Sequence, residues 1–383
     1  MRIGVDIDIL TLPNPYTGIP NYLRHLANGL AQFKPDVAHF YLLSRRQVYE
    51  NDILPAHVSP VVVRWPLGWG WQSVVLPCAA WWLRFDLLHM PAFAVPPFVP
   101  CPVVVTVHDL AYLTHPEWCR EETVSYLSRR VPRALRKASA VITPSAFVRD
   151  EVVRCFGVPT ERIHPILHGV SPAFRVLPKE EVTDTRQEMG LPERFLLYVG
   201  TIEPRKNLLG LIQAFGQAVA QGLDHSLVIA GAKGWKCTDI YALPRQLGLE
   251  HRVLFPGYVP GNLLPALYNA ATIFVYPSLY EGFGLPVLEA MACGTPVVAS
   301  NVSSLPEVVG EAGILVNPLD KDELASAILV LASNEGMRQD LSRKGLEWAA
   351  QFSWERTAQE TVRVYETCSN HATRDLCRGP AKA

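Results

Sequence analysis

Two glutamates lie eight positions apart in the stretch SLYEGFGLPVLEAMACG, residues 278–294. Glu281 precedes a Gly-Phe-Gly turn, and Glu289 lies about one turn inside a helix that Pro286 is expected to begin, because proline suits the first helical position. Carboxylates accept hydrogen bonds, and sugar hydroxyl groups can donate them. A single glutamate near a helix start more often only balances local charge, so the prediction of a sugar-binding site depends on the whole ordered stretch.

The turn between the two glutamates is predicted to present backbone amides to a ligand. Glycines at positions 282 and 284 allow the backbone to approach a bound group closely. The first N–H groups of the following helix have no partner inside that helix. The amides expected to face the ligand are those from about Phe283 to Val287, which include Gly284 and Leu285.

A second stretch, YVGTIEPRKN, brings two cations to the start of another predicted helix. The preceding strand is expected to end at Gly200, and Arg205 and Lys206 come shortly before the helical pattern LLGLIQAF. Adjacent cations beside a helix N-terminus supply fixed positive charge and free N–H groups, which together suit a diphosphate. Taken alone, a solvated basic turn is an equally good interpretation. The sequence has no G-x-x-x-x-G-K-[ST] motif, which excludes a P-loop.

His108 follows the apolar run VVVTV in the first half of the chain, so it is expected at a strand end. An imidazole can exchange protons near neutral pH. A lone histidine is nevertheless more often a structural residue than a catalytic one. The residues around it leave both roles open.

The sequence pattern around these residues predicts an α/β protein, whose strands and helices would hold them in place. Continuous Val/Ile/Leu runs, typical of parallel strands covered on both faces, alternate with helical patterns through both halves of the 383-residue chain. This alternation predicts two Rossmann-like, doubly wound parallel sheets. Ligands of such sheets bind beyond the carboxyl ends of the strands, which is where the three stretches above are expected.

Apolar periodicity gives way to glycine, proline and charge in the segment ILHGVSPAFRVLPKEEVTDTRQEMG, so a domain boundary is predicted there. The expected organisation is an N-terminal domain at 1–170, a linker at 171–190 and a C-terminal domain at 191–352. A last helix at 353–369 is expected to pack back on the N-terminal domain.

The composition argues against several classes of protein. Lysine plus arginine number 35 and aspartate plus glutamate 36, so no overall basic field favours nucleic acid. The chain begins with a strand pattern in place of a signal peptide, and no run reaches the ~18 apolar residues that a spanning helix needs. A cytoplasmic location is therefore expected.

The segment RWPLGWGWQSVVLPCAAWWLRF gathers five tryptophans between Arg64 and Arg84. Core packing, or a wall of the substrate site, is one interpretation of the span from Trp65 to Trp82. The other is a peripheral contact with the inner face of a membrane, because tryptophan favours the boundary between lipid and water.

The stretch from Glu281 to Glu289 resembles the E-x7-E motif of retaining glycosyltransferases of family 4, which have the two-domain GT-B fold. The resemblance extends from the Gly18 loop to the helix at Trp354. It implies that Arg205 and Lys206 hold the donor diphosphate. It also implies that Glu281 contacts the donor sugar and Glu289 the ribose hydroxyl groups.

Other matches to the family concern the rest of the donor. VLFPGYV resembles the segment whose backbone receives the base, which implies a role for Gly257, Tyr258 and Val259. H-D-L implies that His108 reaches the donor sugar, and YTGIPNYLRHL implies that Gly18 lies next to the phosphates. Members often have G-I-G-R-Y where this chain has G-I-P-N-Y, so a second contact there is not carried over.

The resemblance predicts a retaining hexosyltransferase that uses a nucleotide sugar and a saccharide or lipid-linked acceptor. GDP-mannose is the preferred donor, because TGIPNYLRHL and HDLAYLTHPEW are most similar to bacterial mannosyltransferases of polysaccharide assembly. Neither a cofactor nor a metal is expected. Asp6-Ile7-Asp8 matches the metal-binding D-x-D of the other major glycosyltransferase fold, but it lies inside the opening strand pattern.

Three alternatives stay open. The donor is UDP-glucose or UDP-N-acetylglucosamine in the first of them. In the second, the protein is a nucleotide-sugar 2-epimerase of the same architecture. In the third it binds sugar nucleotides without catalysis, although loss of the Glu or Arg-Lys positions would then be expected, and they are all present.

Overall fold

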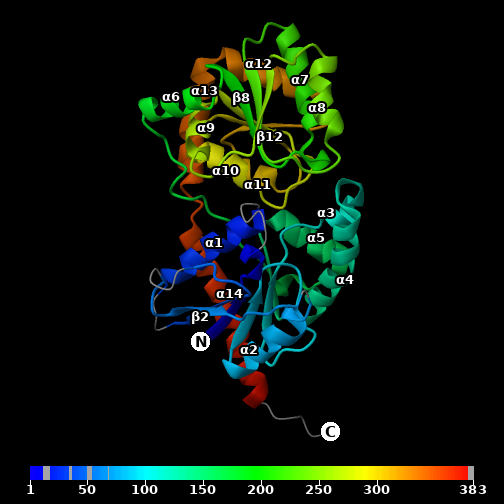
Figure 1. The fold of residues 1–383 in the computed structure, drawn as a ribbon, viewed down its shortest axis with the longest axis vertical. Helices are drawn as coiled ribbons and strands as arrows, with labels where there is room; N and C mark the ends of the chain where they lie inside the picture. The colour runs from blue at the N-terminus through cyan, green and yellow to red at the C-terminus, as the bar shows by residue number, and fades with distance from the viewer. Residues whose placement is uncertain (12–17, 34–36, 50–53, 68, 378–383) are drawn as a thin grey trace. The chain divides into compact units, whose positions relative to one another are not determined.

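The computed structural model describes residues 1–11, 18–33, 37–49, 54–67 and 69–377. The chain forms two compact units (Figure 1). Unit 1 consists of Met1–Gly169 with Ser353–Ala383, and unit 2 consists of Val170–Phe352. Among the described residues, no helix has both the length and the apolar character needed to cross a membrane.

The sheet of unit 1 has the strand order β3-β2-β1-β4-β5-β6-β7. All of its strand pairs in the described residues are parallel. The strands are β1 (Arg2–Asp6), β2 (His39–Ser44), β3 (Val58–Val62), β4 (Leu87–Met90), β5 (Val103–Thr106), β6 (Ala140–Thr143) and β7 (Ile163–Pro165). The order reverses between β1 and β4, so this unit has one switch point at which a ligand can bind.

Helices follow the strands of unit 1, and the last helix of the chain returns to this unit (Figure 1). The helices are α1 (Gly18–Ala31), α2 (Leu76–Trp82), α3 (Ala111–Thr114), α4 (Glu121–Lys137), α5 (Ala146–Phe156) and α14 (Trp354–Cys377). Short turns are η1 (Asp8–Thr11), η4 (Pro116–Trp118) and η5 (Thr160–Arg162), and η3 (Trp71–Val75) is a π-helix.

The close packing of α14 on α1 depends on Gly29. A Cβ atom at this position would lie 2.8 Å from the Cβ atom of Ala358 and 3.0 Å from the Trp354 carbonyl oxygen. Further along α14, the Tyr365 hydroxyl group lies 2.7 Å from Nδ1 of the buried His89. Residues far apart in the sequence are thus joined within unit 1.

The sheet of unit 2 has the strand order β10-β9-β8-β11-β12-β13, and its pairs are parallel in the described residues. The strands are β8 (Phe195–Val199), β9 (Ser226–Ala230), β10 (Val253–Gly257), β11 (Ile273–Tyr276), β12 (Val297–Ser300) and β13 (Ile314–Val316). The switch point lies between β8 and β11. Both strands are buried along their whole length, because helices cover both faces.

The helices of unit 2 begin inside the segment expected to be a linker. They are α6 (Lys179–Glu188), α7 (Leu208–Ala220), α8 (Thr238–Gln246), α9 (Leu264–Ala270), α10 (Leu285–Ala292), α11 (Leu305–Val309), α12 (Lys321–Ser333) and α13 (Glu335–Ala349), with the short η6 (Pro204–Lys206). The Asn269 side chain on α9 accepts from the Leu177 amide at 3.0 Å and donates to the Arg175 carbonyl oxygen at 2.9 Å. Residues 175–177 and α6 therefore belong to the packed structure of unit 2.

Candidate active site

Arg205 and Lys206 lie directly beyond the carboxyl end of β8. They form the short helix η6, and Asn207 then takes a left-handed conformation with φ of 54° before α7 begins. The Asn207 side chain donates to the Pro318 carbonyl oxygen at 2.6 Å, which fixes the turn. A Cβ atom at Gly210 would lie 2.6 Å from the Asn207 side-chain oxygen, so this close packing requires glycine there.

Glu281 lies beyond the carboxyl end of β11, the strand next to β8. Gly284, with φ of 118°, connects its loop to α10, and a Cβ atom at this position would lie 2.7 Å from Leu305. Ser304 donates from its hydroxyl group to the carbonyl oxygens of Glu281 and Phe283, at 2.9 and 2.8 Å. The Ser303 hydroxyl group accepts from the Glu281 amide at 3.0 Å. The loop is thus held at both ends of its turn.

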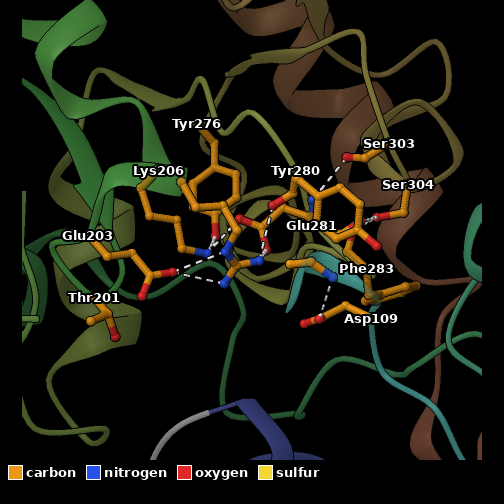
Figure 2. A network of polar contacts seen from close by, with 12 residues as sticks. Asp109, Thr201, Glu203, Lys206, Tyr276, Tyr280, Glu281, Phe283, Ser303 and Ser304 are labelled. Atoms are coloured by element: carbon orange, nitrogen blue, oxygen red, sulfur yellow. Dashed lines mark hydrogen bonds and ion pairs between the residues drawn. The ribbon is translucent and has the colours of Figure 1, made fainter. Parts of the chain in front are cut away.

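The predicted cations and Glu281 form one buried cluster. Lys206 Nζ lies 2.5 Å from Glu281 Oε1, and Arg205 Nη1 lies 3.2 Å from Glu281 Oε2. Arg205 also pairs with Glu203 at 2.9 Å, and Lys206 donates to the Tyr276 hydroxyl group at 3.1 Å. Figure 2 shows Lys206, Tyr276 and Glu281 pointing toward one another. Residues that follow two different strands therefore meet at the switch point of unit 2.

The electrostatics of this cluster favour an ionised Glu281. Burial by itself raises the pKa of the carboxyl group, but the charges of Lys206 and Arg205 outweigh that effect and lower the pKa to about 2. Burial lowers the pKa of Lys206, and the positive charge of Arg205 acts in the same direction. The cluster therefore holds a carboxylate between two cationic side chains, with Lys206 and Glu281 both buried.

Glu289 occupies a different environment on α10. Its carboxyl group is buried and accepts a hydrogen bond from the Tyr268 hydroxyl group at 2.8 Å. Burial raises the pKa of Glu289 to about 7, and the hydrogen bond from Tyr268 only partly opposes the shift. Glu289 is thus poised to change its charge near neutral pH.

The other predicted donor-binding residues of unit 2 lie at neighbouring strand ends. Gly200 follows β8, and a Cβ atom at Gly231, which follows β9, would lie 1.9 Å from the Gly200 carbonyl oxygen. Gly257 ends β10 with φ of 80° and accepts at its carbonyl oxygen from the Gly231 amide at 2.8 Å. Tyr258 is exposed and Val259 is buried. Phe283 and Leu285 flank the Gly284 turn described above.

His108 and Gly18 belong to unit 1. His108 is buried, its Nε2 atom lies 2.8 Å from the Pro91 carbonyl oxygen, and burial lowers its pKa. Because a carbonyl oxygen only accepts, Nε2 carries the proton. Gly18 begins α1, and a Cβ atom there would meet nothing within 4 Å. Residues 12–17 of the predicted Gly18 loop lie outside the described residues.

Asp6 ends β1 and Asp8 begins η1, and both aspartates have other partners. Asp8 pairs with Arg45 at 2.7 Å, and Asp6 accepts from the Trp71 indole N–H at 3.1 Å. Within the described ranges, no group of three His, Cys, Asp or Glu residues is arranged to hold a metal ion.

Sequence reasoning missed several residues that hold the site together. Glu203 and Tyr276 orient the two cations, Tyr268 holds Glu289, and Ser303 and Ser304 fix the loop of Glu281. Tyr276 gave a usable signal, because it ends the strand run TIFVY. The two serines gave none, since their partners lie more than twenty residues away in the sequence.

Comparison with known proteins matches both units. Residues 181–348 match the family described as Glycosyl transferases group 1, and residues 16–174 match Glycosyltransferase Family 4. The O-antigen chain mannosyltransferase B of Escherichia coli is 38% identical over 75% of this chain and 76% of that protein. The serotype-specific mannosyltransferase WbdA of the same organism is 32% identical over 69% of this chain but only 33% of its own length.

A similar solved structure is that of HepE from Anabaena in complex with UDP and glucose. It has a TM-score of 0.74 and 21% identity, over 96% of this chain and 100% of that one. At this identity the likeness concerns the fold alone. It confirms the predicted GT-B class with two Rossmann-like sheets.

Proposed function

The chain belongs to the glycosyltransferases of group 1 and family 4, and we propose that it transfers mannose from GDP-mannose to a hydroxyl group of a saccharide acceptor with retention of configuration. The cluster of Arg205, Lys206 and Glu281 at the switch point of unit 2 carries this proposal. Such a switch point is where open α/β sheets bind their ligands.

In the proposed reaction, Arg205 and Lys206 stabilise the negative charge that develops on the departing nucleoside diphosphate. Glu203 and Tyr276 hold the two cations in place before the donor arrives. Preorganised charges in a dry site need no rearrangement during the reaction, which is the main source of their catalytic effect. Because these side chains supply positive charge themselves, we propose that no metal is needed.

Glu281 is proposed to bind the sugar and not to attack it. With a pKa of about 2, its carboxylate is a weak base, and its oxygens already accept from two cations. A bound diphosphate would compete for those cations and leave the carboxylate oxygens available to the hydroxyl groups of the sugar. The departing phosphate is then the base that takes the proton of the acceptor, and attack from the same face retains the configuration.

The remaining donor contacts follow the residues matched above. Glu289 accepts from the ribose hydroxyl groups, the segment Gly257–Val259 receives the base, and Gly18 lies near the phosphates. For His108, the carbonyl bond at Nε2 leaves Nδ1 as the ring nitrogen that can accept from a sugar hydroxyl group.

The choice of mannose is supported by the names of the two Escherichia coli relatives, both mannosyltransferases. UDP-glucose and UDP-N-acetylglucosamine are the alternative donors. We further propose a lipid-linked saccharide as acceptor, met at the inner face of the cytoplasmic membrane.

A thermal-shift comparison of GDP-mannose, UDP-glucose and UDP-N-acetylglucosamine tests the donor. A ligand at 100 times its Kd stabilises the native state by about 2.7 kcal/mol, so the correct donor must raise the Tm. GDP-mannose is expected to give the largest rise. A larger rise in Tm with a UDP-sugar would identify that sugar nucleotide as the donor in place of GDP-mannose.

Transfer is tested by incubating GDP-mannose with a mannose-terminated oligosaccharide and determining the anomeric configuration of the product by NMR. An α-linked product is expected, because the donor is α-configured. A β-linked product would overturn retention. An epimerised sugar nucleotide formed without acceptor would assign the protein to the 2-epimerases.

A further inference from the structure

Four aromatic side chains of unit 1 project into solvent. Trp81 and Trp82, at the end of α2, are 77% and 82% exposed, and Trp69 and Phe98 are 68% and 73% exposed. The expectation of core packing therefore holds within this segment for Trp71, which is buried in the core of unit 1, and for Trp65, which is partly buried against that core. Exposed apolar side chains that gather in one patch often mark an interaction site.

A row of cations lies on the exposed face of α4, in the same unit. Residues 123–137 contain five cations and no acidic residue: Arg129, Arg130, Arg133, Arg136 and Lys137. All five are exposed, and among the described residues none forms an ion pair. The opposite face of the helix packs into the core through Leu127, Val131 and Leu135.

Hydrogen bonds connect the cation row to the segments that carry the aromatic residues. Arg130 donates to the Gln72 side chain on η3, which leads into α2. Lys137 donates to the carbonyl oxygen of Pro97, the residue before Phe98. The Leu88 amide of β4, a few residues after Trp82, donates to the Pro102 carbonyl oxygen at 3.0 Å. The segment from Pro97 to Pro102 therefore connects the end of α4 to the region just after α2.

A cavity of about 1820 Å³ lies beside α4, with Trp69, Pro97 and the five cations of α4 in its lining. Acidic side chains also line it, but on α4 they are confined to the first turn, at Glu121 and Glu122. Charge is thus segregated along the helix, and the positive part is the one that adjoins Phe98.

We propose that Trp81, Trp82, Phe98 and the α4 cation row form a surface that binds an anionic lipid bilayer. Indole rings favour the interfacial layer of a membrane, and clustered cations are attracted to the negative charge of anionic lipids. The inference extends the proposed function, because it names the surface that would bring the enzyme to a lipid-linked acceptor.

A bilayer fits this surface better than a nucleic acid does. Val62, Leu67 and Val74 in the same part of unit 1 are also exposed aliphatic side chains. A polyanion would pair with the cations and stack on the aromatic rings, but it offers nothing apolar that would cover these groups. Lipid chains and headgroups together satisfy both kinds of residue.

Vesicle sedimentation of the full chain tests the proposal. The vesicles contain either phosphatidylglycerol with phosphatidylcholine or phosphatidylcholine alone, at low and high salt. The wild type is expected to bind the anionic vesicles and to lose binding as salt rises. Trp81→Ala/Trp82→Ala and Arg133→Gln/Arg136→Gln/Lys137→Gln are each expected to weaken binding by about tenfold or more.

Matched controls remove similar groups from unit 2. Leu319→Ala/Val330→Ala removes exposed apolar side chains, and Lys179→Gln/Arg245→Gln/Lys321→Gln removes three cations. Both controls are expected to bind vesicles as the wild type does. Since all substituted side chains are exposed, every variant is expected to keep its Tm and its thermal shift with the sugar nucleotide, which separates this test from that of the donor site.

The proposal would be overturned if the wild type stayed in the supernatant with anionic vesicles at low salt. It would also be overturned if the control variants lost as much vesicle binding as the variants of the proposed surface. If inorganic pyrophosphate abolished vesicle binding and salt of equal ionic strength did not, the cavity beside α4 would be assigned to a free phosphate group. A dimer that depends on Trp81 and Trp82 in the absence of lipid would assign the surface to a second copy of the chain.

Discussion

The two glutamates of the E-x7-E stretch lie on one short loop and helix, yet their surroundings give them opposite electrostatic properties. Glu281 lies between Lys206 and Arg205, and its pKa is lowered to about 2. Glu289 has a tyrosine hydroxyl group as its partner, and its pKa is raised to about 7. Both carboxyl groups are buried, so burial alone does not decide the charge. The presence or absence of a neighbouring cation decides the charge of each carboxyl group.

This contrast suits two different tasks. A permanently ionised Glu281 keeps the two cations in position until a diphosphate arrives. Glu289 can be neutral in the empty site, where burying a charge is costly, and can ionise when the ribose hydroxyl groups supply hydrogen bonds.

Glu281→Gln should have the largest effect on stability. The substitution leaves Lys206 and Arg205 without their shared counter-charge, and loss of one partner from a buried ion pair costs about 3 kcal/mol or more. Chemical denaturation at pH 7 measures the change. Glu347→Gln is the control, because Glu347 pairs with Arg343 at 2.9 Å on the exposed surface, where an ion pair contributes little to stability. Equal stability of the two variants would contradict the assigned role of the cluster.

Arg205→Ala and Lys206→Ala should each lower kcat by roughly 10²-fold or more, on the scale of removing one preorganised donor. Turnover at saturating donor measures the effect. Arg245→Ala on the exposed surface of α8 is the matched loss of a cation and should leave turnover unchanged. Near-normal turnover in both site variants would remove the diphosphate assignment.

The pH dependence of stability should have opposite signs for the two glutamates. The raised pKa of Glu289 means that the native state keeps a proton that the unfolded chain releases, so its contribution to stability is present below pH 4.5 and is lost as pH rises to about 7. The lowered pKa of Glu281 gives stability that is present above pH 4.5 and lost toward pH 2. Each slope is at most about 1.4 kcal/mol per pH unit. Unfolding free energies of Glu289→Gln between pH 5 and 7 should lack the first slope, and an unchanged slope would show that Glu289 does not titrate there.

Glu289→Gln should weaken donor binding by about tenfold at pH 8, the loss expected for a charge-assisted hydrogen bond to ribose. Calorimetric titration with the donor nucleotide measures it. In the wild type, affinity should fall as pH drops below 7, because the carboxyl group becomes protonated, and the variant should show no such fall. If the donor affinity of the wild type did not change with pH, Glu289 would not be the residue that binds the ribose.

Tyr268→Phe should have the smallest effect. The hydroxyl group that it removes donates to Glu289 and lowers its pKa, so the pKa should rise further in the variant. The midpoint of pH-dependent donor binding should therefore move to higher pH, with a stability loss of about 1 kcal/mol. Tyr241→Phe, at an exposed side chain on α8, should leave the midpoint in place. A midpoint that shifts downward would mean that Tyr268 acts on Glu289 in the opposite way.

Much of the fold could be predicted because its signals are local. The buried runs of β8 and β11 and the glycine turn at Gly284 follow from side-chain type and spacing along a few residues. The same holds for the position of Arg205, Lys206 and Glu281 just after predicted strands. The helix α6 in the expected linker was missed, because its sequence KEEVTDTRQE is polar and has no buried residue of its own.

The exposure of Trp81 and Trp82 could not be read from the sequence, since tryptophan is equally compatible with a core and with an interface. Packing separates them from Trp71 only ten residues away. The Trp71 indole donates to Asp6 and packs in the core of unit 1, whereas Trp81 and Trp82 at the end of α2 are exposed.

The candidate chemical residues, and the fact that each follows a strand, could be inferred without a structure, because residue type and periodicity are properties of short segments. The partners of the two glutamates depend on the folded arrangement: Lys206 pairs with Glu281 across 75 residues, and Tyr268 on another helix donates to Glu289. The charge state of a buried carboxyl group depends on the atoms within a few ångströms of it, and the order of the strands determines which distant residues those are.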